Sequence, residues 1–374
     1  MLWSPRWCRM WCSRSAASSF AWLSVLFVLA VPAGASSDKS QAKAHCDLDR
    51  IISWFPVSCE ALTVFRSPFS IKAINRSEGL PEDFADTFRS RLVRLPLPME
   101  KNQIIPNSFL NGKTILFLVA ASRFQLPDGR TAAQKGGLED ASVMVFGDDA
   151  VEALEEAMKL GRQCATEVYR EADREVIVLS EYENLLFEAF PANFYFCSPG
   201  EGLLVCASSK EIMHEILVRM GNGKSSIERG HWPTGRILPQ ELPEWTLLDR
   251  RADIWALRHY DKRTGAADRT SANYLRAEDA SIYRDEAPGG VVFTYLQAIS
   301  QVKISYLSGD AKAQEVRLRS WQYEGNLLPP FKESQSGSVL TLTFDMAGAI
   351  ASQRRELAVN IWHLLGYDTS LFSE

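Results

Sequence analysis

The sequence lacks the motifs that mark the common catalytic and metal-binding classes. It contains no C-x-x-C pair, and its five histidines are scattered along the chain, so a metal site is not expected. A G-x-S-x-G serine elbow is also missing. His214 and Glu215 begin a zinc-protease pattern, but the second histidine that this pattern needs four residues later is absent. These absences predict no metal and no cofactor.

A phosphate-binding loop is incomplete. Gly221–Ser225 reads GNGKS, but the full motif needs a glycine where Val218 stands. The motif also needs a strand before the loop and a helix after it, whereas here a helix is predicted before it. We interpret this stretch as a helix end followed by a linker, so nucleotide binding is not predicted.

Basic blocks and long apolar runs are also lacking. The chain has 41 Lys and Arg residues against 46 Asp and Glu, and its net charge is −5. An acidic chain without a basic block argues against nucleic acid and anionic membrane surfaces as partners. Beyond the N-terminal region no run approaches the length of a membrane span. The remaining partner classes are a protein and a small molecule.

The N-terminus has the features of a secretory signal. Three arginines precede the apolar run Phe20–Val31, and Ala33–Ala35 forms an A-x-A cleavage site. The run is short for a bilayer span. We therefore predict cleavage between Ala35 and Ser36 and export to the periplasm or the medium.

The predicted signal affects both the charge and the start of the chain. Removing residues 1–35 removes three arginines and no acidic residue, which takes the net charge from −5 to −8. The stretch before the apolar run is long for a signal, and starting at Met10 instead of Met1 would give a more usual length.

Two cysteines flank a predicted hairpin. If its turn centres between Glu201 and Gly202, then Cys197 and Cys206 lie directly opposite each other. An exported protein can form disulfides, and this geometry would permit a bridge between the two strands. Two buried free thiols are the alternative reading.

One strand–helix unit occurs twice in the sequence. Val143–Gly161 and Leu203–Gly221 align without a gap, and each reads as an apolar strand followed by an amphipathic helix. We interpret the pair as an internal repeat, with chance similarity as the alternative. Residues 61–180 read strand, helix, strand, strand, helix, strand. This order predicts an α+β fold of ferredoxin-like units, with antiparallel sheets and helices packed on one face.

The chain divides into five predicted regions. Residues 1–35 are the signal peptide, and residues 36–46 are a disordered mature N-terminus. Residues 47–221 form the first α+β domain, which contains the repeat. Residues 222–244 are a linker rich in glycine, serine and proline. Residues 245–374 form the second α+β domain.

Two sequence segments resemble segments of a loose group of uncharacterised exported bacterial proteins. The first is Ile51–Pro56 leading into Ala61–Val64, and the second is the hairpin Phe194–Ala207 followed by Ser208–Met220. The resemblance covers about a third of the chain. It implies an exported bacterial protein and carries no catalytic residue.

These observations favour a binding or interaction module that works without catalysis. The alternative is an envelope hydrolase whose site lies at the domain junction, with His231, Asp253 or His259 as its candidate residues. Aromatic residues near the linker would line a groove there or pack the two domains together.

Overall fold

The computed structural model describes most of the chain after residue 47. All of the described residues belong to one compact unit that extends from Ala42 to Glu374. They are residues 48–55, 59, 61–70, 83–90, 112–122, 141–185, 188–200, 202–222, 242–260, 289–308, 314–315, 318, 321–322 and 327–365. The predicted signal peptide, its cleavage site at Ala35 and Ser36, and the predicted disordered segment lie outside them.

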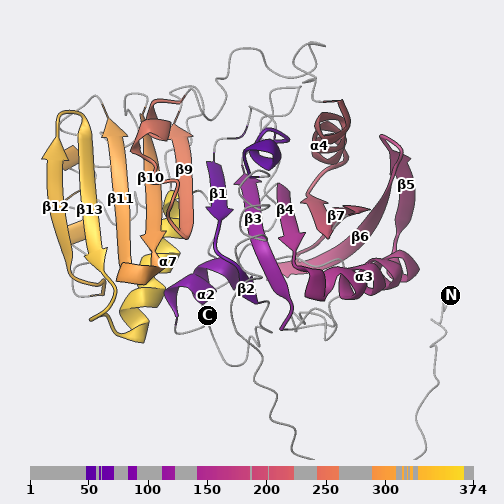
Figure 1. Ribbon diagram of the computed structural model, residues 1–374, viewed down its shortest axis with the longest axis horizontal. Helices are drawn as coiled ribbons and strands as arrows, with labels where there is room; N and C mark the ends of the chain where they lie inside the picture. The colour runs from indigo at the N-terminus through magenta and orange to yellow at the C-terminus, as the bar shows by residue number, and fades with distance from the viewer. Residues whose placement is uncertain are drawn as a thin grey trace, which may run out of the picture. The chain divides into compact units, whose positions relative to one another are not determined.

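The described strands form a 13-stranded sheet in which all of their pairings are antiparallel (Figure 1). Its order is β12-β13-β11-β10-β9-β1-β3-β4-β8-β7-β6-β5, with β2 beside β3. The strands up to β8 are β1 (Ala61–Phe65), β2 (Phe69–Ser70), β3 (Thr114–Ser122), β4 (Ala141–Phe146), β5 (Glu167–Glu171), β6 (Arg174–Leu185), β7 (Glu188–Gly200) and β8 (Leu203–Ala207). The others are β9 (Ile254–Tyr260), β10 (Gly289–Leu296), β11 (Gln301–Ser308), β12 (Phe331–Ser336) and β13 (Val339–Asp345).

Helices are few among the described residues, and the α+β class is confirmed. The α-helices with defined bounds are α2 (Phe84–Ser90), α3 (Val151–Cys164), α4 (Lys210–Asn222) and α7 (Ala351–Leu364), and a short helix covers residues 48–52. The 3-10 helices are η2 (Asp148–Ala150), η5 (Pro243–Leu247) and η8 (Gln297–Ile299). Among the described helices, none combines the length and the hydrophobicity of a membrane-spanning segment.

Strand β1 joins the two halves of the sheet. Its Val64 pairs with Val119 of β3 on one side and with Trp255 of β9 on the other. All five residues of β1 are buried, as expected for a strand that is covered on both faces. Strands from both predicted domains therefore lie in one sheet. The predicted linker falls mostly outside the described residues, and the division into two folding units stays a prediction.

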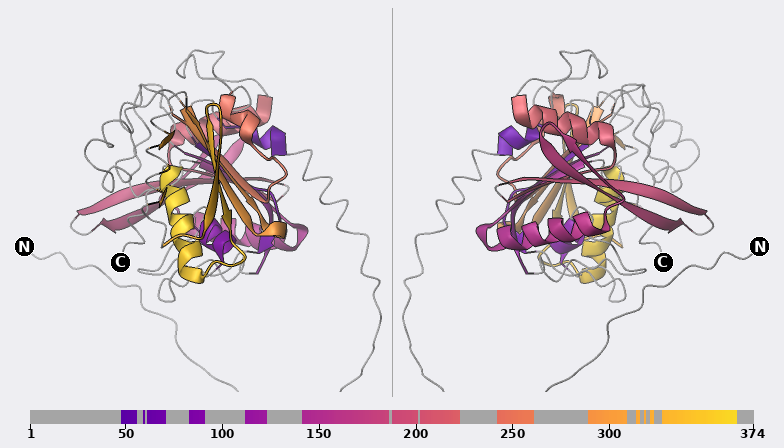
Figure 2. Two further views of the ribbon diagram at one scale, coloured as in Figure 1. Left: turned by 90° about the vertical axis from the view of Figure 1, so that its left-hand side faces the viewer. Right: turned by 90° about the vertical axis from the view of Figure 1, so that its right-hand side faces the viewer.

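Helices pack on both faces of the sheet, so the prediction that they share one face is wrong. One buried cluster joins one side of the sheet to α2, α3 and α7. A second cluster joins the other side to α4 and the 48–52 helix. Figure 2 shows α3 and α4 with the sheet between them.

The rotation of the apolar stripes explains this difference. Leu154 is buried on α3, yet the aligned residue on α4 is the exposed His214. Ile212 is buried on α4, yet it aligns with the exposed Glu152. Both strand–helix units form, but their helices turn different sides towards the sheet. A common origin of the two units stays a prediction.

The ferredoxin-like units are not confirmed. In such a unit the strands on either side of a helix are parallel and are separated by a third strand. Here β1 and β3, which flank α2 in the sequence, are direct antiparallel neighbours.

Candidate functional site

The residues proposed for a hydrolase do not form one site in the part of the chain that the structure describes. His231 lies outside the described residues. Asp253 directly precedes β9 and His259 is near its other end. Six residues of strand separate their backbones by about 20 Å. Asp253 holds a turn, because it accepts hydrogen bonds from the Ser67 hydroxyl and, at 2.7 Å, from the backbone N–H of Gln297.

His259 instead forms a pair with Glu244, a residue that no sequence motif marks as a site residue. The imidazole Nδ1 donates to the Oε1 of Glu244 at 3.0 Å. The Glu244 side chain is 1% exposed and that of His259 is 31% exposed. Among the described residues no hydroxyl or thiol group hydrogen-bonds to His259. This pair therefore anchors η5 on the sheet and has no nucleophile within its hydrogen bonds.

The hairpin of Cys197 and Cys206 has the predicted turn but a shifted register. Gly200 pairs with Leu203, so the turn centres between residues 201 and 202, and an irregularity then shifts the register before Cys197. Cys197 consequently pairs with Val205 and Cys206 pairs with Phe196. A shift of one residue moves a side chain to the other face. The two sulfurs lie in different core clusters, so the predicted facing pair is not formed.

Burial governs the chemistry of Cys197. Its side chain is fully buried, and this loss of solvation raises the pKa of the thiol to about 11 despite the nearby Arg174. A thiol that stays protonated at neutral pH is a poor nucleophile. Cys197 is therefore part of the core and does not fit a catalytic role.

His214, which begins the incomplete zinc motif, contacts the hairpin of β5 and β6 from α4. Its Nδ1 lies 2.8 Å from the Oε1 of Glu171. Lys210, one turn earlier, lies 4.3 Å from the centre of the Tyr169 ring and 3.8 Å from the carboxylate of Glu167. The described residues contain no group of three or more metal-ligating side chains.

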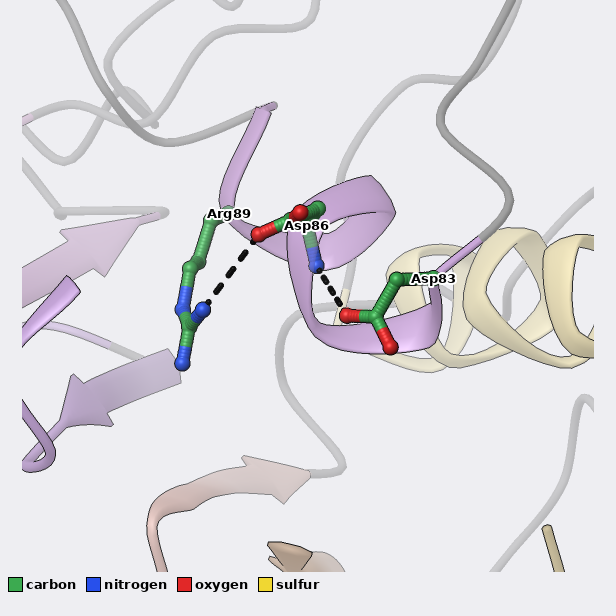
Figure 3. Close-up of polar contacts among 3 residues, drawn as sticks. All are labelled: Asp83, Asp86 and Arg89. Carbon is green, nitrogen blue, oxygen red and sulfur yellow. Dashed lines mark hydrogen bonds and ion pairs between the residues drawn. The ribbon is translucent and has the colours of Figure 1, made fainter. Parts of the chain in front are cut away.

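A polar group at the start of α2 also has a structural role (Figure 3). Asp83 accepts a hydrogen bond from the backbone N–H of Asp86 at 3.0 Å, as helix-capping residues do. Arg89 donates to the carboxylate of Asp86 at 3.4 Å, and its guanidinium lies 4.7 Å from the centre of the Phe69 ring. Loss of solvation lowers the pKa of Arg89. These contacts hold α2 over the aromatic core.

The most distinctive surface element is the outer part of the hairpin formed by β6 and β7. Pairing of β5 with β6 ends at Val178, and pairing of β7 with β8 ends at Tyr195. Strands β6 and β7 continue to pair beyond these points, from Leu179–Phe194 to Leu185–Glu188. Residues 179–185 and 188–194 are called the projecting ribbon below. Figure 2 shows that it extends past the rest of the sheet.

The base of the projecting ribbon is fixed differently on its two faces. Leu179 and Phe194 are buried in the core cluster that lies beneath α2, α3 and α7. On the other face, the Ser180 hydroxyl donates to Asn193 Oδ1 at 2.6 Å. The Thr166 hydroxyl lies 3.1 Å from that of Ser180. The ribbon therefore leaves the core from a defined position.

Beyond this base, neither outer edge of the ribbon pairs with another strand of the described chain. Unpaired edge strands present rows of N–H and C=O groups that can pair with another chain. An isolated two-stranded ribbon is also only marginally stable in water. The geometry therefore fits an element that gains stability when a partner binds.

The sequence pattern does not predict this ribbon. The apolar residues of this region predict three short strands, Glu175–Ser180, Phe187–Phe190 and Asn193–Cys197, whereas the structure has two long ones. Pro191 made a continuous strand less expected, because proline weakens a strand prediction. Proline is nevertheless permitted in edge strands. Pro191 was therefore compatible with one long edge strand, and this was the only sequence feature that could have indicated it.

Taken by its fold, the chain is an antiparallel α+β protein with helices on both sheet faces. No family model and no curated protein matches it, so the resemblance to exported bacterial proteins stays a prediction. The chain is similar to two solved structures of TP0453. Crystal form I has 10% identity and a TM-score of 0.43, and the match covers 85% of this chain and 97% of that one. Crystal form III has 10% identity and a TM-score of 0.38, with 84% and 98% covered.

Proposed function

We propose that this is an exported binding protein that docks a protein partner through the projecting ribbon. The observation that carries the proposal is the extension of β6 and β7 beyond both neighbouring strands. Export rests on the arginines, apolar run and A-x-A site of the N-terminus. The partner is taken to be a protein because an open strand edge recognises another backbone.

The energetics favour docking over a purely structural role for the ribbon. Ordering a residue costs about 1–2 kcal/mol of backbone entropy, which a ribbon without sheet neighbours recovers poorly. Strand addition by a partner supplies main-chain hydrogen bonds along the whole edge. A ribbon that costs conformational entropy when it is alone and is stabilised by added hydrogen bonds in a complex suits a protein that works by binding.

The hydrolase alternative receives less support from the described residues. It needs an acid, a base and a nucleophile in mutual contact, whereas Asp253 and His259 lie at opposite ends of β9. Each also makes a contact that stabilises the fold. We therefore base the proposal on binding.

Photocrosslinking tests this proposal. A photoreactive phenylalanine analogue replaces Asn184 near the ribbon tip, and in a control protein it replaces the exposed Asp173 in the turn between β5 and β6. Irradiation in cells of the native host should give a discrete adduct from position 184 that position 173 does not give. Equal adducts from both positions, or none from position 184, would contradict docking through the ribbon.

A further inference from the structure

The two outer edges of the projecting ribbon are not equivalent. Pro191 of β7 pairs with Tyr182 of β6 and has no backbone N–H. A proline is compatible with strand pairing when its nitrogen faces away from the paired strand. The missing donor of Pro191 therefore belongs to the outer edge of β7, and it interrupts that edge for an incoming strand. The outer edge of β6 between Ser180 and Leu185 contains no proline.

The outer edge of β6 also continues the edge along which β5 already pairs with β6. Strand β5 covers the first part of β6 up to Val178. Just before β5 begins, the backbone N–H of Thr166 donates to the carbonyl of Val178 at 2.9 Å. The next residues of β6 lie beyond this bond. An added strand would extend the line of β5 along Ser180–Leu185, which spans about 20 Å.

The charge of the ribbon indicates the chemistry of the occupant. Residues 179–194 include Glu181, Glu183 and Glu188 and contain no lysine or arginine. A basic extended segment would be attracted to this edge, and opposite charges across paired strands stabilise a sheet. A second copy of this chain fits less well. Symmetric antiparallel pairing about Tyr182 would set Glu181 of each copy against Glu183 of the other, and like charges in that position are destabilising.

We propose that the outer edge of β6, from Ser180 to Leu185, accepts a basic extended segment of a partner protein as an added strand. This inference rests on the proposed function, because both use the projecting ribbon, and it adds the edge and the partner chemistry.

Binding of synthetic peptides tests the assignment. The probe is a fluorescent, end-blocked peptide of alternating lysine and valine, about eight residues long to match the edge. One control peptide replaces lysine by glutamate. A second control keeps the lysines but carries N-methyl groups on alternate amides, which removes backbone donors without changing the charge. Fluorescence anisotropy gives the Kd of each peptide at about 50 mM salt.

Three protein variants complete the design. The double variant Glu181→Gln/Glu183→Gln removes two charges from the edge, and Glu152→Gln/Glu155→Gln makes the same change at exposed positions of α3. In the ribbon-shortened variant an Asn-Gly turn joins Ser180 to Asn193, which is a favoured two-residue hairpin connection. Circular dichroism confirms that each variant folds.

We expect saturable binding of the lysine peptide to the wild-type protein. The affinity should fall about tenfold or more in Glu181→Gln/Glu183→Gln and stay unchanged in the α3 variant. The ribbon-shortened variant and the N-methylated peptide should give no saturable binding. The inference is overturned if the N-methylated or glutamate peptide binds equally well, if the α3 variant loses as much affinity, or if the wild type binds no peptide.

The outcomes also separate this inference from the proposed function. If position 184 gives its adduct while the lysine peptide fails, docking through the ribbon stands and the β6 assignment is wrong. A dimer that disappears in the ribbon-shortened variant would identify the occupant as a second copy and would likewise overturn the inference.

Discussion

The carboxyl group of Glu244 occupies the space that a side chain on Gly290 would fill. A Cβ built on Gly290 would lie 2.3 Å from both Cγ and Oε1 of Glu244. Gly290 is also the strand partner of His259, which hydrogen-bonds that same carboxylate. The absence of a side chain at Gly290 thus permits a partly buried ionisable pair between η5 and the sheet.

We expect Gly290→Ala to lower the free energy of unfolding by about 2–3 kcal/mol, because the added methyl displaces a buried carboxylate from its partner. Urea unfolding followed by circular dichroism measures the change. Gly221→Ala is the matched control, since a Cβ there meets nothing within 4 Å and alanine favours a helix. The control should be neutral or slightly stabilising. Equal losses in the two variants would refute the role given to Gly290.

The turn between β5 and β6 holds an alanine in an unfavourable backbone conformation, and this can be tested. Ala172 and Asp173 both adopt positive φ, at 47° and 62°. This conformation suits a two-residue hairpin turn but is unfavourable for alanine. Ala172→Asn should raise the free energy of unfolding by about 0.5–1 kcal/mol, because asparagine tolerates this region. Ala172→Val should lower it by a similar amount or more. The opposite order in thermal or urea unfolding would contradict the turn geometry.

Burial of Cys197 predicts a loss of stability at alkaline pH. The thiol has an ordinary pKa of 9.0 and a folded pKa of about 11. Below pH 9.0 both states keep the proton and nothing is lost. Between these two values the unfolded thiol loses its proton first, so the free energy of unfolding falls as the pH rises. The loss should level off above the folded pKa at about 2–3 kcal/mol.

Comparison with Cys197→Ala isolates this contribution. Alanine lowers stability at all pH values through the lost volume, but it removes the alkaline slope of this thiol. Burial also raises the pKa of Tyr195 and Tyr295, and those slopes remain in both proteins. Urea unfolding at about pH 8 and pH 11 should show a larger drop in the wild type. Parallel profiles would mean that Cys197 is hydrated in the native state.

The buried ion pair on α4 provides a fourth test. The Nε of Arg219 donates to the Oε1 of Glu215 at 2.8 Å, and the two side chains are 6% and 0% exposed. Glu215→Ala should cost about 3–5 kcal/mol, because it leaves a buried guanidinium without this carboxylate. The double variant Glu215→Leu/Arg219→Met should recover most of that loss. A double variant that is as unstable as the single one would show that the pair contributes more than charge balance.

Much of the local structure was predictable from the sequence. The apolar stripe containing Ile212 and Ile216 predicted α4, and both residues are buried. The start of α4 is held by a serine, as is usual for helix caps, since the Ser209 hydroxyl accepts from the backbone N–H of Ile212 at 3.2 Å. Such features depend on neighbouring residues, whose spacing can be read directly.

The features that the sequence did not predict depend on pairing between residues far apart in the chain. The merging of both halves into one sheet arises because β1 pairs with β9, nearly two hundred positions later. Local periodicity contains no information about such a partner. The cysteine pair failed for a related reason, since one irregularity near Pro199 changes which residues face each other. The projecting ribbon was missed because its length is visible only when the ends of β5 and β8 are known.

Partner capture from cells of the native host by the wild-type and ribbon-shortened proteins tests the central claim most directly. Quantitative mass spectrometry compares the two, with Gly221→Ala as a folded control. We predict a partner that is enriched equally by the wild type and the control and at least about tenfold less by the shortened protein. Equal enrichment of the same proteins by all three would contradict docking through the ribbon.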